Sequence, residues 1–194
     1  MWKMVVRVLV LVMLAPLSGL AHATLIDFED YAAGERVAEV SGARFSAATG
    51  VRAYDFGVFN HFLAHSGSKT VAPGGANFAG GLAVDFERGV TDLSFWSGGD
   101  DIAGKQASID VYTGGAFESS VAMRGDGNFW TTDFHDLSAF ANVTRIEIVN
   151  VRDPLGLVYD DFSFRAQAVP APMTVGLIGV GLIGVGISTR RRGR

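Results

Sequence analysis

The chain has 194 residues, of which 48% are hydrophobic, and it carries a formal net charge of −4 at pH 7. A net acidic chain lacks the basic footprint of nucleic-acid binding, so we expect no nucleic-acid partner. It contains no cysteine, which excludes disulfides and thiol nucleophiles.

Residues 1–23 have the order of a secretory signal peptide. Lys3 and Arg7 form a positively charged start, residues 8–14 an apolar stretch, and Ala-His-Ala a small-x-small cleavage site before Thr24. We therefore expect export of the chain, with signal peptidase cutting before Thr24. A permanent N-terminal anchor is the alternative, because residues 4–20 are almost wholly apolar.

Residues 24–167 are expected to form one domain. All 20 acidic residues lie in this stretch, against 10 of the 16 basic ones, so its formal charge is near −10. Such a surface favours solubility or cation binding. A domain of this size buries a sizeable core. Without disulfides, that core or a bound metal must hold the domain together.

The pattern of this domain is that of short strands, and helical periodicity is absent. Alternating or apolar runs predict strands at residues 24–28, 36–40, 51–58, 69–72, 82–86, 90–96, 107–112, 117–123, 143–151 and 157–164. About ten short strands at regular spacing predict an all-β fold, an antiparallel β-sandwich of the jelly-roll type, with a small barrel as the alternative. Gly114-Gly115 predicts a tight hairpin.

Acidic residues gather at the two ends of the domain. Asp27 and Glu29 occupy alternate positions near the first strand, and Asp160 and Asp161 lie in the last. If the first and last strands pair, as in many jelly rolls, these residues come close together. Carboxylate oxygens converging on one sheet edge would suit Ca²⁺, which takes about 6–8 oxygen ligands. The alternative is that water solvates them at a strand edge.

Other motifs indicate no catalytic site. Asp100, Asp101 and Asp126 lack the order of an EF-hand calcium loop, so we interpret them as turn residues. Residues 99–106 approach a phosphate-binding loop, but Gln106 replaces the Ser or Thr and two aspartates would repel phosphate. No Gly-x-Ser-x-Gly elbow is present. We expect no enzymatic activity. The alternative is a hydrolase with a pair of catalytic carboxylates, whose spacing the fold would set.

Two tryptophans are candidates for contact with a sugar ring. In residues 90–96, alternation puts Leu93 and Phe95 on one face of the strand and Trp96 on the other, beside polar residues. Trp130 follows a glycine-rich turn and could supply a second platform from a loop. The alternative for both is ordinary packing in the core or at an edge.

The chain closes with a proline motif, an apolar span and a basic tail. Residues 168–194 hold Val169, Pro170, Ala171 and Pro172, then apolar residues 173–189, then Arg190, Arg191, Arg192 and Arg194. A helix over the apolar residues would be about 25 Å long, slightly short of a hydrocarbon core of about 30 Å, and arginines can snorkel across the difference. We expect a single transmembrane helix whose tail lies in the cytoplasm.

This order resembles the PEP-CTERM sorting signal of Gram-negative bacteria. The resemblance covers residues 169–194, with Pro-Ala-Pro where that family has Pro-Glu-Pro. It implies that an exosortase recognises and cuts the signal. The chain would then pass transiently through the inner membrane to the cell surface or the exopolysaccharide matrix.

The two ends of the domain resemble those of lectin-like PEP-CTERM domains and of jelly-roll carbohydrate-binding modules. In the latter an N-terminal acidic pair and a C-terminal Asp hold a structural calcium, which implies that role for Asp27, Glu29 and Asp160 or Asp161. The resemblance implies a non-catalytic module that binds exopolysaccharide. The alternative is a structural matrix protein that contacts itself or other proteins without glycan specificity.

Overall fold

Short strands paired edge to edge make up the fold. The computed structural model describes residues 22–55, 63–74, 78 and 80–168. The strands are β1 (Ala23–Ile26), β2 (Glu39–Val40), β3 (Ala43–Ser46), β4 (Val51–Asp55), β5 (Lys69–Pro73), β6 (Leu82–Gly98), β7 (Gly104–Thr113), β8 (Ala116–Gly125), β9 (Thr132–Asp136), β10 (Val143–Val149) and β11 (Val158–Ala166). Every ladder between these strands is antiparallel.

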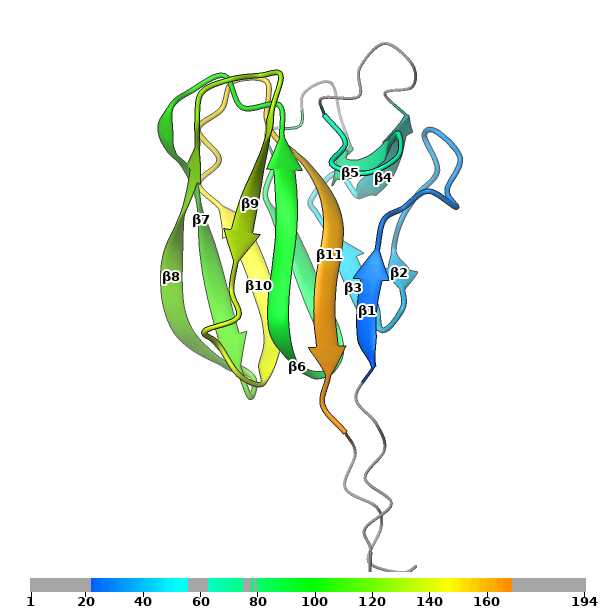
Figure 1. Ribbon diagram of the computed structural model, residues 1–194, viewed down its shortest axis with the longest axis vertical. Coiled ribbons are helices and arrows are strands. Elements are labelled where there is room, and N and C mark those ends of the chain that lie inside the picture. Colours follow the sequence, from blue (N-terminus) through cyan, green and yellow to red (C-terminus); the bar gives the residue numbers. More distant parts are fainter. Residues whose placement is uncertain (1–21, 56–62, 75–77, 79, 169–194) are drawn as a thin grey trace, which may run out of the picture. The chain divides into compact units, whose positions relative to one another are not determined.

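Strand β6 is shared by two layers (Figure 1). Its first half pairs with β3 and β10, and this layer continues outward to β2 on one side and to β7 and β8 on the other. Its second half pairs with β9 and β11, and β11 pairs in turn with β1 and β5. The predicted all-β antiparallel sandwich is therefore confirmed, and so is the pairing of the first and last strands.

The strand changes layers at Gly89 and Val90. Val90 pairs both with Val143 of β10 and with Ala166 of β11, so it belongs to both ladders. Gly89 has no room for a side chain, because an added Cβ would collide with the side chain of Asn142. A glycine at this corner lets the neighbouring backbone approach closely.

Four phenylalanines connect the two layers in the core. The ring centroid of Phe45 in β3 lies 5.3 Å from that of Phe162 in β11, and both rings contact Phe28. Phe162 also stacks on Phe95 of β6, with 5.0 Å between the centroids. All four side chains are at most 3% exposed. Aromatic pairs of this kind stabilise a core beyond the area that they bury, so this cluster fixes how the layers face each other.

A bulge interrupts β11 at its acidic pair. The register to β6 shifts between Asp160 and Ser163, and Asp161 has a positive φ of 47°. An extra residue in one strand re-aims the side chains around it. As a result both aspartates are buried, and Phe162 still reaches the core.

Several predicted elements differ from the structure. The predicted strands 82–86 and 90–96 are one continuous strand, and residues 36–40 form only the short β2 and an isolated bridge. Neither β3 nor β9 was predicted, and the sequence of β9 is polar. The predicted hairpin is confirmed: Gly114 and Gly115, both with positive φ, join β7 to β8.

The terminal predictions lie almost wholly outside the described residues. These are the signal peptide at residues 1–23 and the sorting signal at residues 168–194. Residues 22–167 form one compact unit. In this part of the chain, no helix has the length and apolar character needed to cross a membrane.

Removal of one ring from the phenylalanine cluster should destabilise the domain strongly. We expect Phe162→Ala to lower the free energy of unfolding by about 3–5 kcal/mol, since it leaves a cavity between the layers. Denaturant unfolding followed by circular dichroism measures this change. The exposed Phe117→Ala is the control, with an expected loss below about 1 kcal/mol. Equal losses in the two variants would contradict the role of the cluster.

His135 of β9 is a buried titratable group. It is 7% exposed, its ring packs beside Phe95, and its Nε2 lies 2.8 Å from the hydroxyl of Ser97. Burial lowers the pKa of His135 to about 4. The folded state therefore keeps this imidazole neutral at pH values where the unfolded chain, with a pKa near 6.5, takes up a proton.

Stability should consequently depend on pH through His135. Its contribution is fully present above about pH 6.5 and is lost as the pH falls toward 4, with a total of about 3 kcal/mol. We expect the difference in unfolding free energy between the wild type and His135→Gln to change by this amount between pH 7 and pH 4. Denaturant unfolding at a series of pH values measures it, and a difference that stays constant would contradict the account.

Candidate functional site

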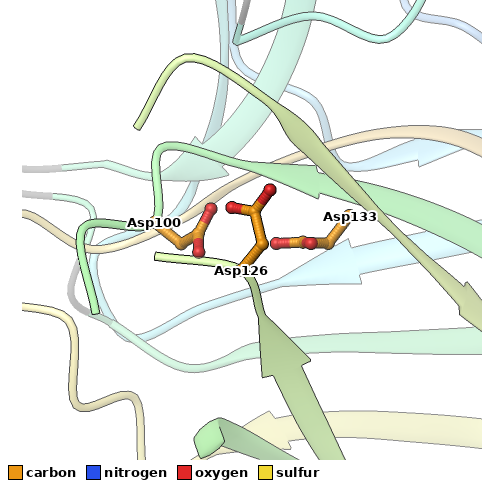
Figure 2. A group of neighbouring side chains, drawn as sticks. All are labelled: Asp100, Asp126 and Asp133. Carbon is orange, nitrogen blue, oxygen red and sulfur yellow. The ribbon is translucent and has the colours of Figure 1, made fainter. Parts of the chain in front are cut away.

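Three aspartates converge at one end of the sandwich (Figure 2). Asp100 follows β6 by two residues, Asp126 comes directly after β8, and Asp133 lies in β9. Each offers a carboxylate oxygen within 4.8 Å of those of the other two. Because successive strands run antiparallel, the β6–β7 and β8–β9 connections emerge at the same end of the sandwich. We call these three residues the aspartate cluster.

Hydrogen bonds hold Asp100 in place. Its Oδ2 accepts one from Gln106 Nε2 at 2.6 Å and one from the backbone N–H of Gly127 at 2.7 Å. Gln106 sits where the register between β7 and β8 shifts, and its side chain is buried beside Asp100. Gly125 leaves space for both, because a Cβ there would collide with the amide of Gln106 and the carboxylate of Asp100.

Asp126 shapes the turn that carries Trp130. Its Oδ1 accepts from the backbone N–H of Asn128 at 2.8 Å, and its two oxygens lie 3.1 and 2.9 Å from the hydroxyl of Thr131, which donates. The backbone N–H of Trp130 donates to Asn128 Oδ1 at 3.2 Å. This turn leaves the Trp130 residue 63% exposed.

The aspartate cluster has unsatisfied buried oxygens. Asp100 is fully buried, and neither its Oδ1 nor Oδ2 of Asp133 has a hydrogen-bond partner. Burial, and then the negative charges of Asp100 and Asp126, raise the pKa of Asp133 to about 6. Three negative charges so close together repel one another, so binding of a cation or a proton stabilises this group of carboxylates.

Sequence reasoning missed this cluster. Asp100 and Asp126 do lie in loops, as predicted. Their side chains, however, come close to each other and do not only stabilise the turns in which they lie. Asp133 was not singled out, since β9 was not predicted. The available signal was two glycine-flanked aspartates in connections that an alternating antiparallel order places at the same end.

An aromatic group lies on the outer face of β6 and β9. Trp96 and Phe134 are opposite each other in the ladder, with 5.0 Å between ring centroids, and His65 stacks on Trp96 at 3.5 Å. Leu93 and Phe95 point into the core, as the alternation predicts. We call Trp96, Phe134 and Trp130, which belongs to the turn that leads into β9, the aromatic strip.

The two predicted sugar platforms are therefore not equivalent. Phe134 is 52% exposed and Trp130 63% exposed, whereas Trp96 is half-buried and has one face covered by His65. Trp130 and Phe134 offer the accessible rings, and Trp96 lies beside Phe134. Sequence reasoning missed Phe134 because its strand has a polar sequence.

Three of the four predicted calcium ligands, Glu29, Asp160 and Asp161, contact residues 65–69. Glu29 Oε1 and Asp160 Oδ2 each accept two backbone N–H groups of this loop, at 2.7–3.2 Å. Asp161 Oδ1 accepts a hydroxyl of the same loop at 2.8 Å, and Asp27 Oδ1 accepts the N–H of Glu29 at 3.3 Å. Burial, followed by the charge of Asp161, raises the pKa of Asp160 to about 7. Backbone donors already serve these oxygens, and a calcium ion there stays a prediction.

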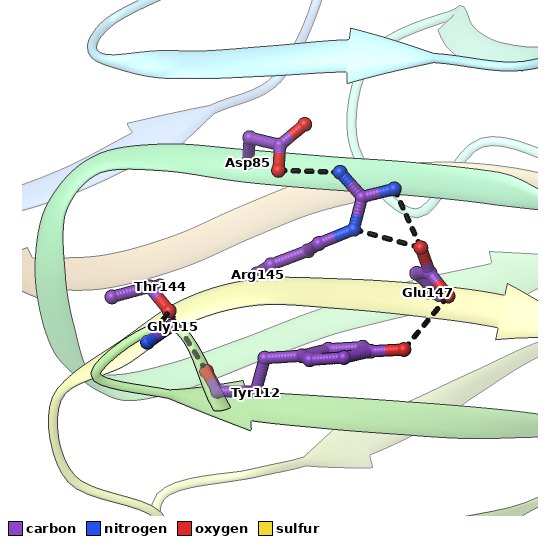
Figure 3. Close-up of polar contacts among 6 residues, drawn as sticks. All are labelled: Asp85, Tyr112, Gly115, Thr144, Arg145 and Glu147. Atoms are coloured by element: carbon purple, nitrogen blue, oxygen red, sulfur yellow. Dashed lines mark hydrogen bonds and ion pairs between the residues drawn. The ribbon is translucent and has the colours of Figure 1, made fainter. Parts of the chain in front are cut away.

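On the other layer, Arg145 lies between Asp85 and Glu147 (Figure 3). Its guanidinium donates to both carboxylates, with 2.8 Å from Nε to Glu147 Oε1. The hydroxyl of Tyr112 donates to Glu147 Oε2 at 3.1 Å, and this hydrogen bond is the main reason that the pKa of Tyr112 is raised. Because both acids are ion-paired, they do not form the free acid–base pair that glycoside hydrolysis needs.

Two grooves among the described residues lie away from the aspartate cluster and the aromatic strip. The larger, of about 460 Å³, is lined by Arg145, Glu147 and mostly small residues of β3, β6 and β10. The smaller, of about 250 Å³, lies between β1 and the corner of β6. Neither is lined by the aspartate cluster or the aromatic strip.

Comparisons with known proteins identify no family. No family model matches the chain, and no curated protein is similar to it. The resemblance of residues 169–194 to the PEP-CTERM signal therefore stays a prediction.

Several solved structures have a similar fold. The K2 cleaved adhesin domain of Lys-gingipain is 15% identical, with a TM-score of 0.49 over 73% of this chain and 97% of that one. The K1 domain of Lys-gingipain from Porphyromonas gingivalis W83 is 13% identical, with a TM-score of 0.44 over 75% and 99%. A carbohydrate binding module from Cellvibrio mixtus lichenase 5A, in complex with cellotriose, is 17% identical, with a TM-score of 0.32 over 74% and 97%. At these identities and TM-scores, the similarities identify neither a ligand nor an activity for this chain.

Proposed function

We propose that this chain is an exported, non-catalytic module of the jelly-roll type that binds a neutral polysaccharide at the cell surface or in the extracellular matrix. The observation that carries the proposal is the aromatic strip. Phe134 presents an exposed ring beside Trp96, and Trp130 presents another from the turn that leads into β9. Sugar rings bind such surfaces by stacking their apolar face on an aromatic ring.

Polar groups around the strip supply hydrogen-bonding capacity. Thr132 lies between the two exposed rings in the sequence, and its hydroxyl lies 3.4 Å from Nδ1 of His65. Asp126 and Asn128 occupy the turn just before Trp130. An apolar platform with nearby donors and acceptors is the usual composition of a saccharide site.

The charge of the domain favours a neutral ligand. With a formal charge near −10 over residues 24–167, the domain repels anionic polysaccharides at low ionic strength.

The sequences at the two ends of the chain support the proposed location at the cell surface or in the extracellular matrix. A signal-peptide pattern at residues 1–23 fits export, and the PEP-CTERM-like order at residues 168–194 fits processing by an exosortase. We propose that signal peptidase and an exosortase are processing partners, that the membrane holds the chain only transiently, and that the domain acts after release.

Binding should depend on the exposed rings of the strip. We expect Trp130→Ala and Phe134→Ala each to weaken binding about tenfold, equal to about 1.4 kcal/mol, because each loses a stacking surface. Affinity electrophoresis of the full chain in gels that contain β-glucan, xylan, galactan or mannan measures this loss. Alginate serves as the anionic comparison and should bind more weakly.

The matched control is Phe117→Ala. Phe117 is also exposed, at 57%, but it lies in β8 of the other layer. This variant should bind like the wild type. Retardation by none of the neutral polysaccharides, or equal losses in all three variants, would contradict the proposed function.

A further inference from the structure

We infer that the aspartate cluster binds Ca²⁺, and that the ion joins the β6–β7 loop to the turn that carries Trp130. This site differs from the one predicted at Asp27, Glu29, Asp160 and Asp161. It goes beyond the proposed function and does not depend on glycan binding.

The spacing of the carboxylates suits one shared ion. Calcium–oxygen distances are about 2.3–2.6 Å, so two ligand oxygens of one ion lie within about 5 Å of each other. Oxygens of Asp100, Asp126 and Asp133 lie within 4.8 Å of one another. Figure 2 shows the three side chains meeting in one small region from separate segments of the chain.

Buried oxygens without partners give a second, independent indication of a ligand. Asp100 is 0% exposed, and its Oδ1 has no hydrogen-bond partner. Asp133 is only partly buried, but its Oδ2 atom is buried and also has no hydrogen-bond partner. Buried polar atoms in folded proteins nearly always have a partner, and each exception calls for an ion or a water molecule. A cation between the two residues would satisfy both oxygens.

The surroundings of the cluster favour calcium. Among the described residues, none of the ion pairs involves these three aspartates. The donors are all oxygens and come from loops and an edge strand, which suits an ion that accepts irregular geometry. Water or backbone carbonyls would complete its shell. Mg²⁺ is less suitable because it demands nearly ideal octahedral geometry.

The ion would strengthen a contact that the loops already make. Gly127 in the turn after β8 donates its N–H to Asp100 in the loop after β6. Asp126 in turn organises the residues that precede Trp130. A cation held by both segments would order the turn and the position of the Trp130 ring.

The test uses the purified full chain, freed of metal with EDTA and then titrated with CaCl₂. We expect heat of binding in isothermal titration calorimetry. We also expect a rise in Tm of about 5–10 °C at a calcium concentration 100 times the Kd. Asp126→Asn and Asp133→Asn should lose this binding event, and Asp126 is exposed enough that its variant should fold.

The Tm of the variants without metal distinguishes a cation site from a purely structural role of the acids. If the cluster is a cation site, Asp133→Asn, which changes a residue whose Oδ2 has no hydrogen-bond partner, removes repulsion and should leave Tm in EDTA equal to or above that of the wild type. If the acids served only as structural hydrogen-bond acceptors, Tm in EDTA would fall. Asp110→Asn, on the face of β7, is the control with the same change of charge and should keep the calcium response.

Three results would overturn the inference. The first is no response to CaCl₂. The second is a calcium response that Asp126→Asn and Asp133→Asn retain and Glu29→Gln abolishes, which would assign the ion to the other acidic group. The third is a response to MgCl₂ alone.

Discussion

The course of β6 is the constraint on which the rest of the structure depends. One strand serves both layers, turning at Gly89, where an added Cβ would collide with Asn142. Its second half carries Trp96 on the outer face and Phe95 in the core, and its end leads directly to Asp100. Strand β9, which holds Asp133 and Phe134, finds its place only by pairing with β6. The aromatic strip and the aspartate cluster are therefore two consequences of one backbone path.

Much of the fold could be predicted from local patterns. Alternation located most of the strands, a glycine pair located the hairpin between β7 and β8, and the expected jelly-roll architecture predicted the pairing of β1 with β11. What failed were elements whose formation depends on tertiary contacts. The sequence of β9, Thr-Asp-Phe-His-Asp, is polar. It forms a strand because it pairs with β6 and because the side chain of His135 is buried in the core. Local propensity is weak evidence for such a strand.

For the candidate sites, too, local sequence patterns did not predict which segments meet in space. Trp130 was identified from its glycine-rich context, whereas Phe134 and Asp133 were missed with their strand. The bulge at Asp161 could not be read from the sequence either, and there two of the four acids of the predicted calcium site, Asp160 and Asp161, are buried and hydrogen-bonded to residues 65–66. Conversely, Asp100 and Asp126 looked like separate turn residues, and only the antiparallel order brings them together. Sequence patterns thus identified the chemistry on each segment, and the topology determined which segments meet.

Assignment of the ligand-binding face tests the account most directly. In a ¹H–¹⁵N NMR spectrum, the indole N–H signals of Trp96 and Trp130 report on the aromatic strip. Titration with a neutral oligosaccharide that retards the chain should shift the indole signal of Trp130 and the amide signals of β9 most strongly. Largest shifts around Arg145 and Phe117, on the other layer, would contradict a binding surface at the aromatic strip.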